Sequence, residues 1–146
     1  NEINTVANAD AEISSLSGFN PANTAIVDVR FSEQMIDGLD NVGTSITLTE
    51  YEPNYLKYNS TSSKNGIAIF SEIYYDKGWN AYVNGELKPH FRANFVLRGM
   101  QIPSGKHVVE FKFEPAVYQV SESIALASSI ILLLLLAFVS FKELKA

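Results

Sequence analysis

Residues 71–89, SEIYYDKGWNAYVNGELKP, contain a pair of tyrosines, the only tryptophan of the chain and an Asn-Gly dipeptide. Successive side chains of a strand point to opposite faces, so Trp79 and Val83 share a face that we expect to lie in the core. Asn84-Gly85 is the strongest two-residue hairpin signal, because a type I′ turn needs positive φ at both positions. The stretch therefore predicts a β-hairpin with Trp79 on its inner face.

Similar short segments with strand character recur along the chain, separated by turn residues such as those at 60–66 and 103–106. Strands spaced in this way favour an antiparallel β-sandwich, jelly-roll-like, in a mainly β fold. The segment 67–75 is the most apolar, so we expect it to be a central strand. The predicted strands cover residues 24–31, 44–51, 53–60, 67–75, 79–83, 86–93, 94–102 and 107–115.

Two further segments complete the soluble part. A short N-terminal helix is predicted, with Asp10 as its N-cap, Ile13 and Leu16 on one face, and Gly18 after its end. Residues 32–43 are polar and rich in turn formers, which is typical of a loop.

Residues 123–141, SIALASSIILLLLLAFVSF, run without a charge. A helix of this length covers roughly the 30 Å hydrocarbon core of a bilayer. The segment is apolar all round, unlike the amphipathic helices of soluble cores, and so predicts a C-terminal transmembrane helix. Lys142 and Lys145 follow it, which places a short tail in the cytoplasm and residues 1–120 outside by the positive-inside tendency.

The composition excludes several classes of function. The formal net charge is −5 and the eleven Lys and Arg residues form no dense run, so nucleic acid is not an expected partner. There is no cysteine for a disulfide or a thiolate site. Because the chain starts at Asn1, we expect it to be a piece of a longer or processed polypeptide.

No motif points to chemistry in this chain. The two histidines, His90 and His107, fall at unrelated places in the strand pattern, and neither a nucleophile elbow nor a phosphate loop occurs. No residues are spaced as metal ligands. We therefore predict no catalytic residue, no metal site and no cofactor.

A set of polar and aromatic residues near the strongest strands forms the candidate site. Arg98 is expected to be partly buried, and a buried arginine needs a carboxylate such as Glu72. One interpretation is an internal ion pair, and the other is that an arginine binds an anionic lipid diphosphate or phosphosugar. The candidate residues are Glu72, Tyr75, Tyr82, Arg92, Asn94 and Arg98, of which Tyr75 and Tyr82 are the rings that could face a ligand; Trp79, Asn84 and Gly85 are the core and turn signature.

These blocks resemble a known family. FSEIYYDKGWNAYVNGE (70–86) and HFRANFVLRGMQIPSGKHVVEFKFEP (90–115), followed by an apolar helix, resemble the C-terminal end of the bacterial YfhO family. LSGFNPANTAIV (16–27) and TEYEPNYLKYNS (49–60) look like its lead-in. Asp76-Lys77-Gly78 stands where family members often have Pro-Gly before the tryptophan, which alters a turn.

The resemblance implies a polytopic parent similar to GT-C glycosyltransferases, which use polyprenyl-linked sugar donors at the outer face of the membrane. Their catalytic acid lies in an early loop that this chain does not include, so no catalytic residue is carried over. The implied partners are the bilayer, the preceding membrane core of the same polypeptide, and a polyprenyl-linked sugar or glycan.

Two interpretations of function follow. In the first, residues 1–120 form a non-catalytic extracytoplasmic domain and residues 121–146 a span and cytoplasmic tail in the cytoplasmic membrane of a bacterial cell envelope. In the second, the chain is a single-pass interaction or accessory module of an envelope complex without sugar chemistry.

Overall fold

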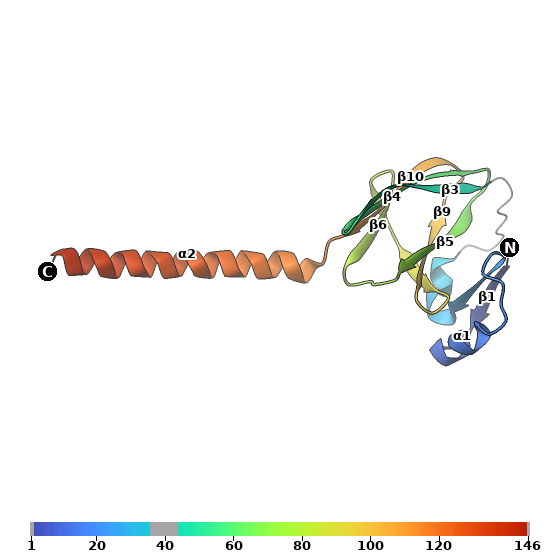
Figure 1. Ribbon diagram of the computed structural model, residues 1–146, viewed down its shortest axis with the longest axis horizontal. Coiled ribbons are helices and arrows are strands. Elements are labelled where there is room, and N and C mark those ends of the chain that lie inside the picture. Colours follow the sequence, from blue (N-terminus) through green and yellow to red (C-terminus); the bar gives the residue numbers. More distant parts are fainter. Residues whose placement is uncertain (1, 36–43, 146) are drawn as a thin grey trace. The chain divides into compact units, whose positions relative to one another are not determined.

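The computed structural model describes residues 2–35 and 44–145. The chain divides into two compact units, Asn1–Phe113 and Glu114–Ala146, and each is described by itself. The first unit is the β-rich body and the second is a long helix, and Figure 1 labels most of their elements.

The centre of the first unit is a β-sandwich, as the sequence predicts. All pairings within its two sheets are antiparallel. The five-stranded sheet has the order β3 (Ser45–Glu52), β4 (Tyr55–Ser62), β10 (Gly105–Phe113), β6 (Trp79–Val83) and β7 (Glu86–Lys88). The three-stranded sheet has the order β5 (Gly66–Ile73), β9 (Leu97–Ile102) and β8 (His90–Ala93).

The main core lies between the two sheets. Phe111 is fully buried and packs edge-to-face against Phe70 and Tyr58, with ring centroids 4.9 and 6.1 Å apart. Val83 belongs to the same cluster and Trp79 packs against it, so the predicted inner face of the hairpin is confirmed. Aromatic pairs in this geometry stabilise a core beyond the area that they bury.

The opening hairpin has the predicted turn. Asn84 and Gly85 both have positive φ, 52° and 82°, as a type I′ turn requires. Val83 pairs with Glu86 across this turn. Pro89 lies between β7 and β8, where the chain leaves one sheet for the other, and its missing N–H therefore removes no bond from either ladder.

A third layer, at the N-terminus, contains the predicted helix and strand together with the strand β1 (Glu2–Val6) and the 3-10 helix η1 (Val29–Gln34), which the sequence did not predict. β1 pairs in parallel with β2 (Thr24–Asp28), and α1 (Ala9–Ser15) connects them. The strand predicted at 24–31 ends at Asp28, because the chain turns into η1. Residues 36–43 of the predicted loop lie outside the described residues.

The helix α1 is present, but its cap and its buried face differ from the prediction. Asn8, not Asp10, is the N-cap, and its Oδ1 accepts from the Ala11 N–H at 2.9 Å. Glu12 is fully buried, whereas Ile13 is exposed. An ion pair of Glu12, described below, therefore determines which face of α1 is buried, and the apolar residues of the helix do not.

The prediction that residues 67–75 form a central strand is wrong, since β5 is an edge strand that pairs with β9 alone. Its apolar character has another cause. Phe70 faces the core between the sheets, while Ile67 and Ile69 pack on the N-terminal layer beside Val27 and Phe91. A strand covered on both faces reads as a continuous apolar run even at an edge.

Two strand boundaries also move. The strand predicted at 94–102 begins only at Leu97, because Asn94 and Phe95 have positive φ and turn the chain between β8 and β9. The strand predicted to end at residue 60 continues to Ser62, so the following turn is shorter than predicted.

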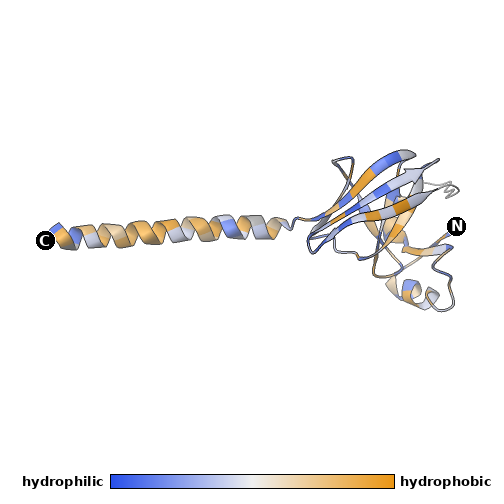
Figure 2. Cartoon of the chain, turned by 45° about the horizontal axis from the view of Figure 1, so that its top comes forward, coloured by the Kyte–Doolittle hydropathy of each residue, from blue (hydrophilic) through white to orange (hydrophobic). Residues whose placement is uncertain are grey.

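The second unit is the helix α2 (Ala116–Lys145). Its segment Ala116–Lys142 is long and apolar enough to cross a membrane, and Figure 2 shows apolar residues along most of it. The expected domain boundary at residue 120 falls inside α2, since no turn former follows Pro115 to start the helix later. Lys142 and Lys145 lie in its last turn.

Candidate functional site

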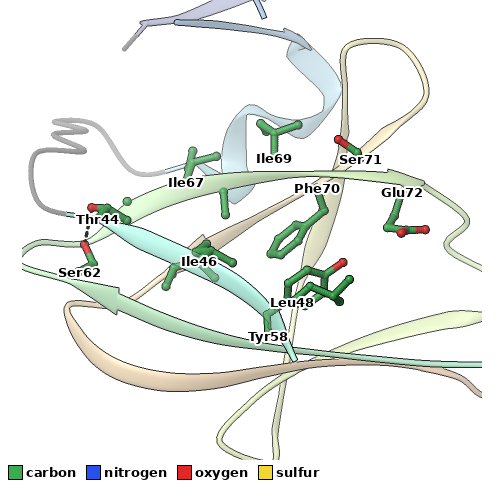
Figure 3. A pocket seen from close by; sticks show the side chains of 13 residues that line it. Thr44, Ile46, Leu48, Tyr58, Ser62, Ile67, Ile69, Phe70, Ser71 and Glu72 are labelled. Atoms are coloured by element: carbon green, nitrogen blue, oxygen red, sulfur yellow. Dashed lines mark hydrogen bonds between the residues drawn. The ribbon is translucent and has the colours of Figure 1, made fainter. Parts of the chain in front are cut away.

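A groove of about 550 Å³ opens between the edge strands of the two sheets. We name it the β3–β5 groove; β3 and β4 form one wall and β5 the other (Figure 3). Thr44 and Ser62 share a 3.0 Å hydrogen bond at one end. Ser71 and Glu72 line it near the C-terminal end of β5. The walls between are apolar, formed by Ile46, Leu48, Ala68 and Phe70 among others.

The main polar groups of the groove lie at the end where Glu72 is. Tyr58 lies across from it on β4, and its ring packs on Phe70 at 4.8 Å between centroids. Burial raises the pKa of the Tyr58 hydroxyl, and the nearby Glu72 carboxylate raises it further. Tyr58 therefore stays a neutral hydrogen-bond donor, and Glu72 supplies acceptor oxygens.

Arg98 lies behind this end and is only 1% exposed, which is deeper than the sequence predicted. Its Nη2 donates to the Ile73 carbonyl oxygen at 2.9 Å, while Nε and Nη1 have no hydrogen-bond partner among the described residues. The guanidinium lies 4.5 Å from the Trp79 ring centroid and 4.4 Å from that of Phe111. The rings of Trp79 and Phe111 thus lie against the Arg98 guanidinium, where the sequence predicts a carboxylate partner.

The expected ion pair between Arg98 and Glu72 is not formed within 4 Å in the described part of the chain. Burial lowers the pKa of Arg98 to about 10, and Glu72 and Tyr58 act in the opposite direction. Arg98 is still protonated at neutral pH. The two residues therefore interact through space, and the carboxylate of Glu72 is available to the groove.

His90 is a second polar group in this region that the sequence did not single out, and it is half-buried. Its ring lies 5.2 Å from that of Tyr74 and 6.3 Å from that of Phe111, and its Nε2 has no partner among the described residues. Burial lowers the pKa of His90 to about 4, and the charge of Arg98 lowers it as well. The imidazole is therefore neutral in the folded protein.

Arg92 and Asn94 lie elsewhere, where β8 meets the N-terminal layer. Arg92 Nη2 donates to Glu12 Oε2 at 2.7 Å, and Glu12 Oε1 accepts from the Phe95 N–H at 2.8 Å. Asn94 exchanges two hydrogen bonds with the backbone of Ile26, at 2.7 and 2.8 Å. Through these hydrogen bonds Arg92 and Asn94 connect the N-terminal layer to the sandwich, which is a structural role.

Asp28 completes this network. It is fully buried and binds Arg30 through three contacts of 2.8 to 3.0 Å, with Arg92 Nη2 at 3.9 Å. The Arg30 guanidinium and backbone N–H hold the pKa of Asp28 below its usual value. Sequence reasoning missed Glu12 and Asp28; the one local signal was an acid placed directly after the apolar run Ala25–Val27 of β2.

The remaining predicted residues lie apart from the groove. Tyr75 stacks on Phe113 with centroids 6.5 Å apart, and a Cβ at Gly78 would overlap both rings. Tyr82 belongs to β6 and lies 4.9 Å from Lys112 Nζ. The predicted candidates thus fall in different places, and Glu72 is the one that lines the groove, with Arg98 buried nearby.

In the described ranges, no group of three His, Asp or Glu residues lies together as a metal ion would need. The geometry of the groove suits binding, with acceptors and hydroxyls at its ends and aliphatic walls between them.

The family model described as bacterial membrane protein YfhO matches residues 31–125, which is about two thirds of the chain. Neither the search of curated proteins nor the search of solved structures returned a match.

Proposed function

The chain belongs to the YfhO family of bacterial membrane proteins, and from this premise we propose that its sandwich is an extracytoplasmic, non-catalytic domain of a sugar-transferring parent. The parent would move sugar from a polyprenyl-linked donor to an acceptor on the cell surface. In this proposal the sandwich holds the saccharide end of donor or acceptor, and the reacting groups come from elsewhere in the parent.

The observation that supports the proposal is the β3–β5 groove. An isoprenoid-linked sugar is an amphiphile, and the groove offers apolar walls together with Glu72 and the Tyr58 hydroxyl at one end. Carboxylates accept the hydroxyl hydrogens of sugars through charge-assisted bonds. An exposed aromatic platform is not needed for this arrangement, which agrees with the packing of the Tyr58 and Phe70 rings against each other in the core beside the groove.

The first prediction concerns Glu72. Replacing Glu72→Ala should weaken binding of a prenyl-phosphate sugar or cell-wall oligosaccharide about tenfold, since a hydrogen bond to a charged group contributes about 1.5–3 kcal/mol. Binding is measured by isothermal titration of the chain in nanodiscs. Glu86→Ala is the matched control, because Glu86 is an exposed acid on β7, at the edge of the five-stranded sheet opposite to β3 and the groove.

The result that contradicts the proposal is equal heat in the two variants, or no heat with either ligand in the unmodified chain. The second outcome favours the accessory module without sugar chemistry. The number of membrane spans in the polypeptide upstream of Asn1 separates the two interpretations independently, since a GT-C-like parent needs many.

The second prediction concerns sidedness. The chain has no cysteine, so single cysteines are clean reporters. We expect Ser104→Cys, in the exposed turn between β9 and β10, to react with a membrane-impermeant maleimide on intact spheroplasts. Lys145→Cys, in the last turn of α2, should react only after lysis, because lysines after a span favour the cytoplasmic side. The reverse labelling pattern contradicts the placement.

A further inference from the structure

The two ends of the sandwich differ in their exposed side chains. We name as the aromatic end residues 51–55, 73–79 and 93–97 together with Phe113, which the strand pairing brings together. Phe113 pairs with Trp79, Lys112 with Tyr55, and Ile73 with Leu97. We name as the polar end residues 62–66, 84–86 and 102–106, at the opposite ends of the same strands.

Apolar side chains are exposed at the aromatic end. The exposed fractions there are 66% for Tyr51, 72% for Ile73, 48% for Tyr75 and 49% for Val96. None of residues 62–66, 84–86 and 102–106 is a large exposed apolar side chain, and Leu87, 61% exposed, is the one that directly follows the polar end in the described part of the chain. A cluster of exposed apolar side chains marks an interaction surface, whereas apolar residues that are exposed singly do not.

The chain itself connects the aromatic end to the membrane helix. Only Glu114 and Pro115 separate Phe113 from Ala116, the first residue of α2. Three extended steps span at most about 11 Å, so the end of β10 stays near the start of α2 whatever their orientation. The polar end has no such restraint.

The length of α2 indicates at which depth of the bilayer the connection between β10 and α2 lies. Its 30 residues span about 45 Å, which matches a bilayer of 40–45 Å that includes both headgroup layers. When the uncharged segment 123–141 fills the hydrocarbon core, residues 116–122 lie in one headgroup layer. Tyr118, in this stretch, is 68% exposed, and tyrosine is enriched at that depth.

We propose that the aromatic end of the sandwich lies against the headgroup layer of the bilayer that α2 crosses, with Tyr51, Ile73, Tyr75 and Val96 as its contacts. Tyr and Trp prefer this layer because one part of the ring system is apolar and the other forms hydrogen bonds. The polar end faces water. This inference needs only a membrane-spanning α2, and stands whichever reaction the parent performs.

The charges of the aromatic end indicate the lipid chemistry. Glu52 and Asp76 accompany Lys77, so the surface has no cationic excess. Attraction to anionic lipids rests on clusters of Lys and Arg. Contact with the bilayer is therefore expected to be driven by apolar and aromatic side chains, and to occur on zwitterionic phosphatidylcholine without anionic lipid.

The native Trp79 is the reporter for this third prediction, because it belongs to the aromatic end. The chain is reconstituted into phosphatidylcholine vesicles, with and without lipids brominated near the headgroup, and Trp79 emission is recorded. Bromine quenches only at short range. We expect marked quenching of Trp79, and several-fold less when the tryptophan is moved to the polar end in the double variant Trp79→Phe and Ser104→Trp.

A second variant tests the contacts themselves. Ile73→Ser with Tyr75→Ser should reduce the quenching while the folded state, followed by circular dichroism, is retained. Equal quenching at both ends, or none at Trp79, overturns the proposal. Disulfide-linked dimers of Tyr75→Cys with unquenched Trp79 also overturn it, and identify a second copy as the occupant. If Trp79 is quenched in the chain alone but not in the parent with its other helices, the proposal is also overturned, and those helices are the contact of the aromatic end.

Discussion

Arg92→Ala is expected to destabilise the sandwich by about 3 kcal/mol, because removing one partner of a buried ion pair leaves the other charge unpaired. Glu12 is fully buried and accepts from Arg92 Nη2 at 2.7 Å, while Arg92 is 21% exposed. Without Arg92, Glu12 keeps only the Phe95 N–H as a donor among the bonds described. The measurement is urea unfolding of the chain in micelles, followed by Trp79 emission.

Lys88→Ala is the control for Arg92→Ala. Lys88 forms an ion pair with Glu86 at 2.6 Å, but both side chains are exposed, and such pairs contribute less than about 1 kcal/mol. The double variant Glu12→Leu with Arg92→Met should recover most of the loss, since apolar replacement of a buried pair is often neutral. If Arg92→Ala costs no more than Lys88→Ala, the network does not hold the N-terminal layer.

The second large effect is a loss of stability in mild acid, caused by His90. Its pKa is lowered to about 4 in the folded protein, chiefly by burial, whereas in the unfolded chain it is near 6.5. The unfolded state therefore binds the proton first. The contribution of neutral His90 is complete above pH 6.5 and is lost as the pH falls from 6.5 to 4, by an amount on the order of 3 kcal/mol.

Unfolding curves at a series of pH values measure this loss. His90→Phe keeps a ring beside Tyr74 and Phe111 and removes the titrating group, so its stability should be nearly level between pH 6.5 and 4. Asp28 does not interfere in this window, since Arg30 holds its pKa below 3.8 and its contribution is lost only in stronger acid. A slope that persists in His90→Phe assigns the effect to other groups.

Local patterns predicted much of the sandwich. Alternation in the hairpin placed Trp79 and Val83 on the core face, where Val83 is buried and Trp79 packs against the core, and Asn84-Gly85 forms the predicted turn. The apolar run within α2 predicted a membrane helix. The family resemblance, drawn from blocks that extend over most of the chain, is confirmed over residues 31–125.

The N-terminal layer could not be predicted in the same way. β1 pairs in parallel with β2, and its bonds go to residues 22 positions away. A parallel pair needs a crossover connection, and its strands show no alternation when both faces are covered. In β2 the residues Ala25, Ile26, Val27 and Asp28 are all buried, so β2 does not show the alternation of buried and exposed residues that marks a strand covered on one face.

The sequence by itself determined the strand segments of the sandwich, the Asn84-Gly85 turn and a helix long and apolar enough to cross a membrane. Hydrophobic period, turn residues and the length of an apolar run are all local properties of the chain. Only the tertiary structure decided the partners of the charged residues. Arg98 lies between Trp79 and Phe111, and Arg92 binds Glu12, 80 positions away. Those contacts depend on which strands become neighbours in the sheets. The edge position of β5 and the groove beside it depend on the same strand pairing, which no local sequence pattern encodes.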